Sequence, residues 1–278
     1  MQERLQAALV ELGLESENRF PRLIGQGKFN AIFEVREGSE RMALRINNIN
    51  DDPAVMDRVD EYEAHCWAAS CGAAPQVFQA TDRFLLMELL ELKHPTVEDL
   101  KDEALLQQIV VATKRLHAGP KLRQRKSLWT RAQYWYERRR DEGRITPELK
   151  AAYEQIERLN VQSVLESVPM VSGHGDLNLG NIALLDDRAV LLDFETAASM
   201  SPFFDLSRFC YVADSEAVNE RTLALYFGEV LPEHKLQLQA SLAMQGFVAA
   251  VFGNTEKASY AVDPIGLARF QKYAESLA

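Results

Sequence analysis

Three polar side chains in the middle of the chain have the types and the order that phosphoryl transfer requires. Asp176 is followed after five residues by Asn181 and, twelve residues further on, by Asp193. In enzymes that transfer a phosphoryl group, one carboxylate accepts the proton of the attacking hydroxyl. An amide and a second carboxylate hold the magnesium ions that bind the nucleotide phosphates. We therefore take Asp176 as the candidate catalytic base, and Asn181 and Asp193 as candidate Mg²⁺ ligands.

The residues between Asn181 and Asp193 predict the element that brings these two ligands together. Residues 182–185 and 189–192 are apolar, and the Asp186-Asp187 pair between them is typical of a turn. A tight hairpin here would place Asn181 and Asp193 side by side at its open end. Their side-chain oxygens are the hard ligands that Mg²⁺ prefers.

The rest of the chain predicts two parts that differ in secondary structure, the first rich in strands and the second mainly helical. Strands are expected at 20–24, 29–35, 42–46, 76–78 and 84–87, with helices at 2–14 and 58–70. Beyond residue 89, helical patterns cover 97–117, 130–141, 147–164, 205–213, 216–227, 234–252 and 264–278. We therefore expect an α+β fold. A small lobe with an antiparallel sheet plus helix spans residues 1–89, and a larger, mainly helical lobe spans residues 90–278.

Two glycines, Gly25 and Gly27, separate the first two expected strands, and Asn30 follows them. Glycine lets backbone N–H groups approach phosphate oxygens without a Cβ in the way. A glycine turn between strands is usually only a hairpin, so the phosphate-binding interpretation depends on the catalytic residues downstream.

Together these motifs resemble those of the aminoglycoside phosphotransferase and choline kinase family, whose members phosphorylate small molecules on a protein-kinase-like fold. The resemblance covers residues 23–209. It rests on His174-Gly175-Asp176, Asn181 and Asp193-Phe194-Glu195. It implies a two-lobed protein-kinase-like fold, ATP and Mg²⁺ as cofactors, a nucleotide-binding lobe over 1–89 and an acceptor site in 90–278. No Ala-Pro-Glu follows Asp193, which argues against a protein kinase.

The same resemblance assigns the nucleotide contacts. Gly25, Gly27 and Asn30 would form the phosphate loop. Arg45, in a Leu-Arg-Ile strand typical of choline and ethanolamine kinases, would take the place of the usual lysine. Glu61 would hold Arg45, with Glu63 as the alternative that fits aminoglycoside phosphotransferases. Adenine would contact the backbone at the joint of the lobes, near Met87 and Leu89.

On the acceptor side, Glu195 would either attract an amino-alcohol cation or bind within its own loop. Asp205 would support the catalytic loop by accepting backbone N–H bonds. The expected acceptor is a hydroxyl compound, with choline, ethanolamine or thiamine ahead of an aminoglycoside or a sugar. A catalytically silent kinase fold is the alternative of another class, but none of Asp176, Asn181 and Asp193 is lost. Candidate aromatic contacts for a quaternary ammonium are Trp129, Tyr134, Trp135, Tyr136, Phe203, Phe204, Tyr211, Phe247, Phe252 and Tyr260.

Net charge, cysteine content and the apolar stretches limit the classes of binding partner that we expect. The 278 residues carry a net charge of −10, which argues against nucleic acid because phosphate binding favours a basic surface. Three cysteines give neither a disulfide framework nor metal-site spacing. No signal peptide or apolar stretch long enough to span a bilayer is recognised. We therefore expect a cytoplasmic protein that binds no membrane; the sequence leaves its oligomeric state open.

Overall fold

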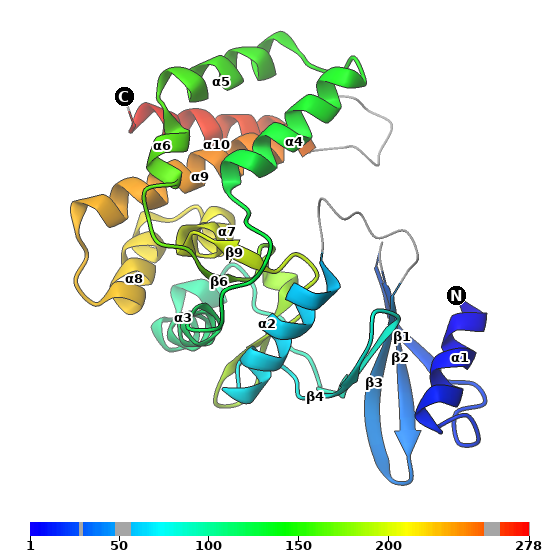
Figure 1. Ribbon diagram of the computed structural model, residues 1–278. Coiled ribbons are helices and arrows are strands. Elements are labelled where there is room, and N and C mark those ends of the chain that lie inside the picture. The colour runs from blue at the N-terminus through cyan, green and yellow to red at the C-terminus, as the bar shows by residue number, and fades with distance from the viewer. Residues whose placement is uncertain (28–29, 48–56, 253–261, 278) are drawn as a thin grey trace.

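A computed structural model describes residues 1–27, 30–47, 57–252 and 262–277. The chain forms an antiparallel sheet with flanking helices at its N-terminal end and a mainly helical C-terminal part, as predicted (Figure 1). Lys28, Phe29, Tyr260 and Ala278, which fall in predicted elements or among the aromatic candidates, lie outside the described residues. No described helix is both long enough and apolar enough to cross a bilayer.

The N-terminal sheet has five antiparallel strands in the order β1-β2-β3-β5-β4. The strands are β1 (Arg22–Gln26), β2 (Asn30–Glu37), β3 (Glu40–Asn47), β4 (Val77–Ala80) and β5 (Phe84–Glu88). Because successive side chains of a strand point to opposite faces, this sheet has two distinct surfaces. One face, with Phe33, Leu44 and Phe84, packs against Leu5 and Leu9 of α1 (Gln2–Leu12). The opposite face is therefore available to line a site.

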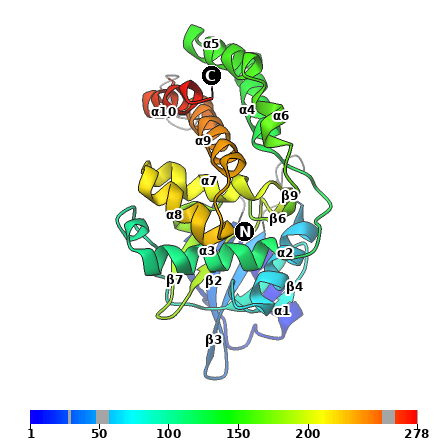
Figure 2. The same ribbon diagram turned by 90° about the vertical axis from the view of Figure 1, so that its left-hand side faces the viewer.

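Helix α2 (Arg58–Ser70) follows β3 and begins where predicted. The Asp57 side chain caps it by accepting hydrogen bonds from the N–H groups of Val59 and Asp60. In Figures 1 and 2, α2 lies between the sheet and the helical part of the molecule.

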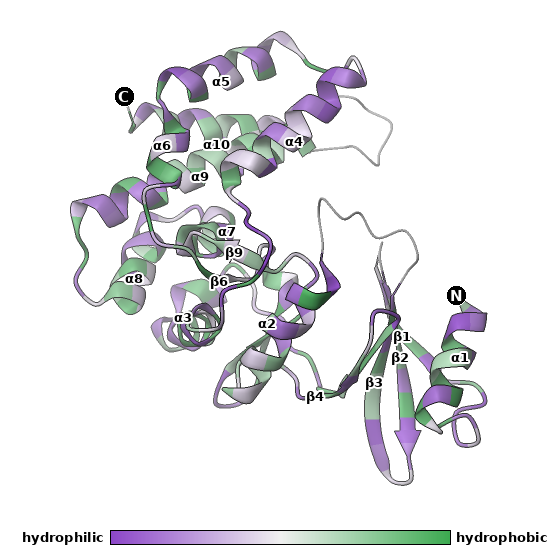
Figure 3. Ribbon diagram, viewed as in Figure 1, coloured by the Kyte–Doolittle hydropathy of each residue, from purple (hydrophilic) through white to green (hydrophobic). Residues whose placement is uncertain are grey.

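The C-terminal part is built around α9 (Pro232–Phe252), whose C-terminal half is coloured hydrophobic in Figure 3. A Cβ on Gly246 would lie 2.6 Å from the backbone nitrogen of Phe270, so glycine permits α10 to pack closely against α9. The surrounding helices are α3 (Glu103–His117), α4 (Leu128–Asp141), α5 (Pro147–Arg158), α6 (Val161–Leu165), α7 (Pro202–Ala213), α8 (Glu216–Phe227) and α10 (Pro264–Glu275).

Two predicted helices are interrupted in the structure. The helix expected over 97–117 is a short 3₁₀ turn, Asp99–Lys101, followed by α3, because the Asp102 side chain caps the N-terminus of α3. The helix expected over 147–164 is split into α5 and α6, because Asn160 between them adopts a left-handed φ of 48°.

The predicted hairpin is present as β7 (Ile182–Leu184) and β8 (Ala189–Leu191). A second small ladder, β6 (Val171–Gly173) with β9 (Ala198–Met200), was not predicted. These two ladders bracket the segment that carries Asp176.

Candidate active site

The loop that carries Asp176 is held by a buried carboxylate from a different element. Asp205, in the first turn of α7, accepts hydrogen bonds from the backbone nitrogens of His174 (2.7 Å) and Gly175 (2.9 Å). His117 of α3 donates a third, through Nε2, at 3.0 Å. Burial alone would raise the pKa of Asp205, but these hydrogen bonds and the nearby histidines hold it below its usual range. The predicted supporting role of Asp205 is confirmed.

His174 ties the catalytic loop to the hairpin. Its Nε2 lies 2.8 Å from the carbonyl oxygen of Leu192, and its ring packs on Phe194 with centroids 4.9 Å apart. The next residue, Gly175, has a φ of 82°, and a Cβ there would lie 2.5 Å from the carbonyl oxygen of Thr196. Only glycine fits both conditions.

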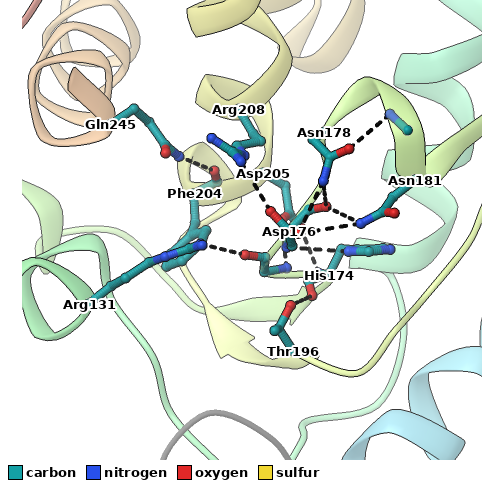
Figure 4. A network of polar contacts seen from close by, with 12 residues as sticks. Arg131, His174, Asp176, Asn178, Asn181, Thr196, Phe204, Asp205, Arg208 and Gln245 are labelled. Carbon is teal, nitrogen blue, oxygen red and sulfur yellow. Dashed lines mark hydrogen bonds and ion pairs between the residues drawn. The ribbon is translucent and has the colours of Figure 1, made fainter. Parts of the chain in front are cut away.

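Asp176 is oriented by hydrogen bonds from its neighbours and by an ion pair (Figure 4). Asn178 donates to its Oδ2 at 3.1 Å, and Asn181 donates to its backbone carbonyl at 2.8 Å. The other oxygen, Oδ1, lies 3.3 Å from Nη2 of Arg208. Among the described residues Oδ1 receives no hydrogen bond.

The two predicted metal ligands lie together at the open end of the hairpin. The backbone nitrogen of Leu192 donates to the carbonyl oxygen of Asn181 at 2.8 Å, and Asp193 follows with a φ of 62°. Burial raises the pKa of Asp193, and its Oδ1 has no hydrogen-bond partner among the described residues. A buried carboxylate oxygen that accepts no hydrogen bond is a suitable ligand for a cation. Because Mg²⁺ is commonly bound by one or two carboxylates together with substrate phosphates, the donor set fits it.

Arg45 is almost fully buried on the sheet face that points away from α1. It forms a short ion pair with Glu61 of α2, and its Nη1 lies 3.5 Å from Oδ1 of Asp193. Arg58 binds the second oxygen of Glu61 at 2.6 Å. Burial opposes ionisation of Glu61, but the two guanidinium groups outweigh it and lower its pKa. Among the described residues, Glu61 rather than Glu63 is the glutamate that contacts Arg45.

A cleft of about 340 Å³ lies between the sheet and the hairpin. It brings together eight of the residues selected from the sequence. They are Gly25, Gly27, Asn30, Arg45, Met87, Leu89, Asn181 and Asp193. The cleft also includes His65 and His94, neither of which was selected from the sequence. His94 contacts the carbonyl oxygen of Ile182 at 2.8 Å.

Glu195 faces the glycine turn. The side chain of Asn30 donates to its Oε2 at 3.2 Å, which joins the start of β2 to the loop after Asp193. Burial, with the neighbouring charge of Asp193, raises the pKa of Glu195 to about 7. This contact reaches the start of β2 rather than the loop of Glu195 itself, so it corresponds to neither of the two roles considered for Glu195.

A second cavity, of about 310 Å³, lies on the other side of the catalytic loop. Gly175 belongs to its wall, whereas Gly180 and Asn181 belong to the wall of the first cleft. Asp176 therefore lies in a loop that borders both cavities, and it is itself a lining residue of neither. The residues lining the second cavity are Arg125, Lys126, Thr130, Arg131, Tyr134, Trp135, Gly175, Thr196 and Phe204.

Several residues around Asp176 were not identified from the sequence. Asn178 lies within the motif, and its proximity to Asp176 was a usable signal. Arg208 lies three residues after Asp205, hence on the same side of α7. Arg131 donates through Nη1 to the carbonyl oxygen of Gly175 at 2.8 Å from 44 residues away. No local pattern indicates such a contact.

The chain is similar to a known protein family and to several solved structures. The model of the phosphotransferase enzyme family matches residues 22–236. A sequence comparison with curated proteins found no match.

Solved structures with the same fold include a choline/ethanolamine kinase family protein from Mesorhizobium loti. It has a TM-score of 0.74 and 18% identity, with 99% of this chain and 93% of that chain covered. An ethanolamine kinase from Plasmodium vivax gives 0.72 and 16%, with 99% and 89% covered. An ADP-bound aminoglycoside phosphotransferase, APH(2'')-Ib, gives 0.65 and 14%, with 99% and 96% covered.

Proposed function

Because this chain belongs to the phosphotransferase enzyme family, and is thus a small-molecule phosphotransferase, we propose that it transfers the γ-phosphoryl group of ATP to a hydroxyl group of a small acceptor. One observation carries the proposal. The loop holding Asp176 borders both a cleft that contains Arg45, Asn181 and Asp193 and a second cavity. Two substrates bound in these cavities would meet at Asp176.

Each residue then has a defined task. The backbone at Gly25 and Gly27 binds phosphate oxygens, and Arg45, fixed by Glu61, pairs with them. Met87 and Leu89 offer backbone groups to the adenine. Asn181 and Asp193 would hold Mg²⁺, which neutralises the charge on the phosphates.

The carboxylate of Asp176 accepts the proton of the acceptor hydroxyl. The acceptor oxygen forms a new bond to the γ-phosphorus. The bond from that phosphorus to the bridging oxygen breaks, and ADP leaves with its electron pair. The products are a phosphate ester, ADP and a proton.

The test measures transfer and nucleotide binding separately in Asp176→Asn. Asn cannot accept the proton, so acceptor-dependent ADP release should fall by about 10²–10⁴-fold. Binding of Mg·ATP, followed by calorimetry, should stay within a few-fold of the wild type. Turnover close to the wild-type rate would refute the role of Asp176. Absence of nucleotide binding in the wild type would refute the function as a whole.

The amino-alcohol acceptor expected from the sequence was based on Glu195, on the Leu-Arg-Ile strand and on the net negative charge. The Glu195 side chain contacts Asn30 and does not line the second cavity among the described residues. The fold similarity to choline and ethanolamine kinases, at 16–18% identity, supports a common fold and leaves the acceptor to be argued from this chain's own cavity.

A further inference from the structure

The second cavity has a one-sided charge. Three of its nine described lining residues, Arg125, Lys126 and Arg131, are cationic, and none is acidic. Arg208 adds a fourth cation beside the loop, where it contacts Asp176. An acceptor with a positive charge would meet like charge here, and an acceptor with a negative charge would be attracted.

The cations are held in place by the protein backbone. Lys126 donates through Nζ to the carbonyl oxygen of Thr196 at 3.0 Å, and Arg131 donates to that of Gly175 at 2.8 Å. Both carbonyl groups belong to the two loops that flank the site of transfer. The ammonium and the guanidinium are therefore fixed at the edge of the catalytic loop.

These cations are partly stripped of water. Burial, together with repulsion from Arg131, lowers the pKa of Lys126 to about 8, and burial also lowers the pKa of Arg131. Among the described residues, the carboxylates that face Lys126 are Asp57 and Asp60. Asp57 pairs with Arg123, and Asp60 accepts the N–H groups of Arg123 and Gln124. An anion in the cavity would offset the cost of burying two like charges.

The aromatic residues of the cavity are already in contact with cations. The guanidinium carbon of Arg131 lies 5.7 Å from the ring centroid of Phe204, and that of Arg138 lies 5.6 Å from Trp135. A quaternary ammonium is recognised through such faces. In this cavity the rings already contact arginine side chains, and a cationic ligand would compete with those arginines for the same ring faces.

We infer that the acceptor carries an anionic group, a carboxylate or a phosphate ester, which binds between Lys126 and Arg131 while its hydroxyl faces Asp176. This inference rests on the proposed function, since it defines the substrate class of the same site. The aromatic rings of Trp135 and Phe204 then pack against the carbon skeleton of the acceptor. A cavity of about 310 Å³ suits a molecule of the size of a single sugar acid.

The experiment compares four probes of similar skeleton: glucose, glucosamine, glucuronate and glucose 6-phosphate. Their binding to the Mg·ADP-loaded protein and their phosphorylation with ATP are both measured. We expect at least one anionic probe to exceed glucose by about 10–100-fold in affinity or in kcat/KM, the range for a charge-assisted contact. Glucosamine should fall below glucose. A preference for glucuronate alone identifies the carboxylate, and one for glucose 6-phosphate alone the phosphate.

The variant Lys126→Glu tests whether Lys126 causes the preference for anionic probes. It should remove most of the preference for the anionic probe and improve glucosamine relative to glucose. Lys121→Glu makes the same change of charge at an exposed site five residues earlier, outside the described cavity lining, and should keep the wild-type ratio.

Two outcomes overturn the inference. One is that neither anionic probe binds or reacts better than glucose. The other is that Lys126→Glu and Lys121→Glu retain the same selectivity. Both outcomes leave the proposed phosphotransfer intact, because that proposal is judged by nucleotide binding and by the Asp176→Asn variant.

Discussion

At the scale of single residues, the geometry of the site depends on one position without a side chain. Gly175 combines a φ of 82° with a carbonyl oxygen 2.5 Å from where a Cβ would stand. The clash is with the backbone of Thr196, which lies in a loop that is itself fixed, so it cannot be relieved by turning a side chain. The conformation of this residue therefore sets the position of the next one, Asp176.

We predict that Gly175→Ala lowers kcat by about 100-fold or more, since a displacement of about 1 Å at a catalytic group has such an effect. Steady-state kinetics and thermal unfolding check it. Gly143→Ala is the matched control, because Gly143 has a φ of 70° but no atom within 4 Å of the added Cβ. It should be slightly destabilised and fully active. Equal activity in the two variants would contradict the argument.

A second residue-scale prediction concerns pH. The pKa of Lys126 is about 8, below its ordinary value of 10.5, so this ammonium loses its proton within an accessible range. If an anionic acceptor binds to it, affinity should be full below pH 8 and fall above it, by up to about tenfold per pH unit. Among the described residues, the charged groups that face Lys126 are Arg131, Asp57 and Asp60. Calorimetry with glucuronate from pH 7 to 9.5 checks it; Lys126→Gln should show weak binding with no such slope.

At the scale of elements, the catalytic loop takes its position from helices that do not touch the nucleotide cleft. Asp205 in α7 binds two backbone nitrogens of the loop, and His117 in α3 binds Asp205. In the same way, Asp60 in α2 accepts the backbone nitrogens of Arg123 and Gln124, which places the segment before α4. Buried carboxylates thus fix both loops that border the second cavity.

We predict that Asp205→Ala destabilises the fold by about 3–5 kcal/mol, because it leaves buried donors from His174, Gly175 and His117 without a partner. Denaturant unfolding measures the loss. Asp187→Ala, at the exposed turn of the β7–β8 hairpin, removes a carboxylate with only a surface contact to Arg188 and should change stability by about 0.5 kcal/mol or less. A loss at Asp205 as small as that at Asp187 would exclude the anchoring role.

The sequence was informative where the chemistry is local. Asp176, Asn181 and Asp193 lie within eighteen residues, and the hairpin that unites the last two follows from its apolar strands and acidic turn. The β6–β9 ladder was missed because each strand has three residues, too few for an alternating pattern. Lys126 and Arg131 were missed for another reason. Their contacts with Thr196 and Gly175 join segments 70 and 44 residues apart, and basic residues near a helix start carry no signal of such partners.

At the scale of the whole molecule, the cleft proposed to bind the nucleotide is shared between the sheet and the helical part. Its walls include Ala43, Arg45 and Met87 from the strands, and Asn181 and Asp193 from the hairpin. Direct contacts already cross it: Arg45 reaches Asp193, and Asn30 reaches Glu195. A ligand in this cleft would therefore stabilise both parts together.

We predict that Mg·ATP raises the unfolding free energy by about 2.7 kcal/mol at a concentration of 100 times Kd. Calorimetric scans with and without Mg²⁺ measure the shift. In Asp193→Ala most of the Mg²⁺-dependent part should disappear, because the carboxylate ligand is gone. A shift of equal size in this variant would exclude Asp193 as a metal ligand.

The wall between the two cavities has a consequence for how such enzymes diverge. The groups assigned to the nucleotide and those that line the second cavity come mostly from different stretches of chain. They approach one another at the loop carrying Asp176 and at the loop after β8, where Asp193 and Thr196 lie. Substitutions in residues 125–135 can then alter the acceptor while phosphate chemistry is inherited unchanged. New acceptors could therefore evolve through changes in the second cavity without loss of nucleotide binding in the cleft. If the acceptor binds in the second cavity, the residues that line it predict the acceptor of a related enzyme better than overall sequence similarity does.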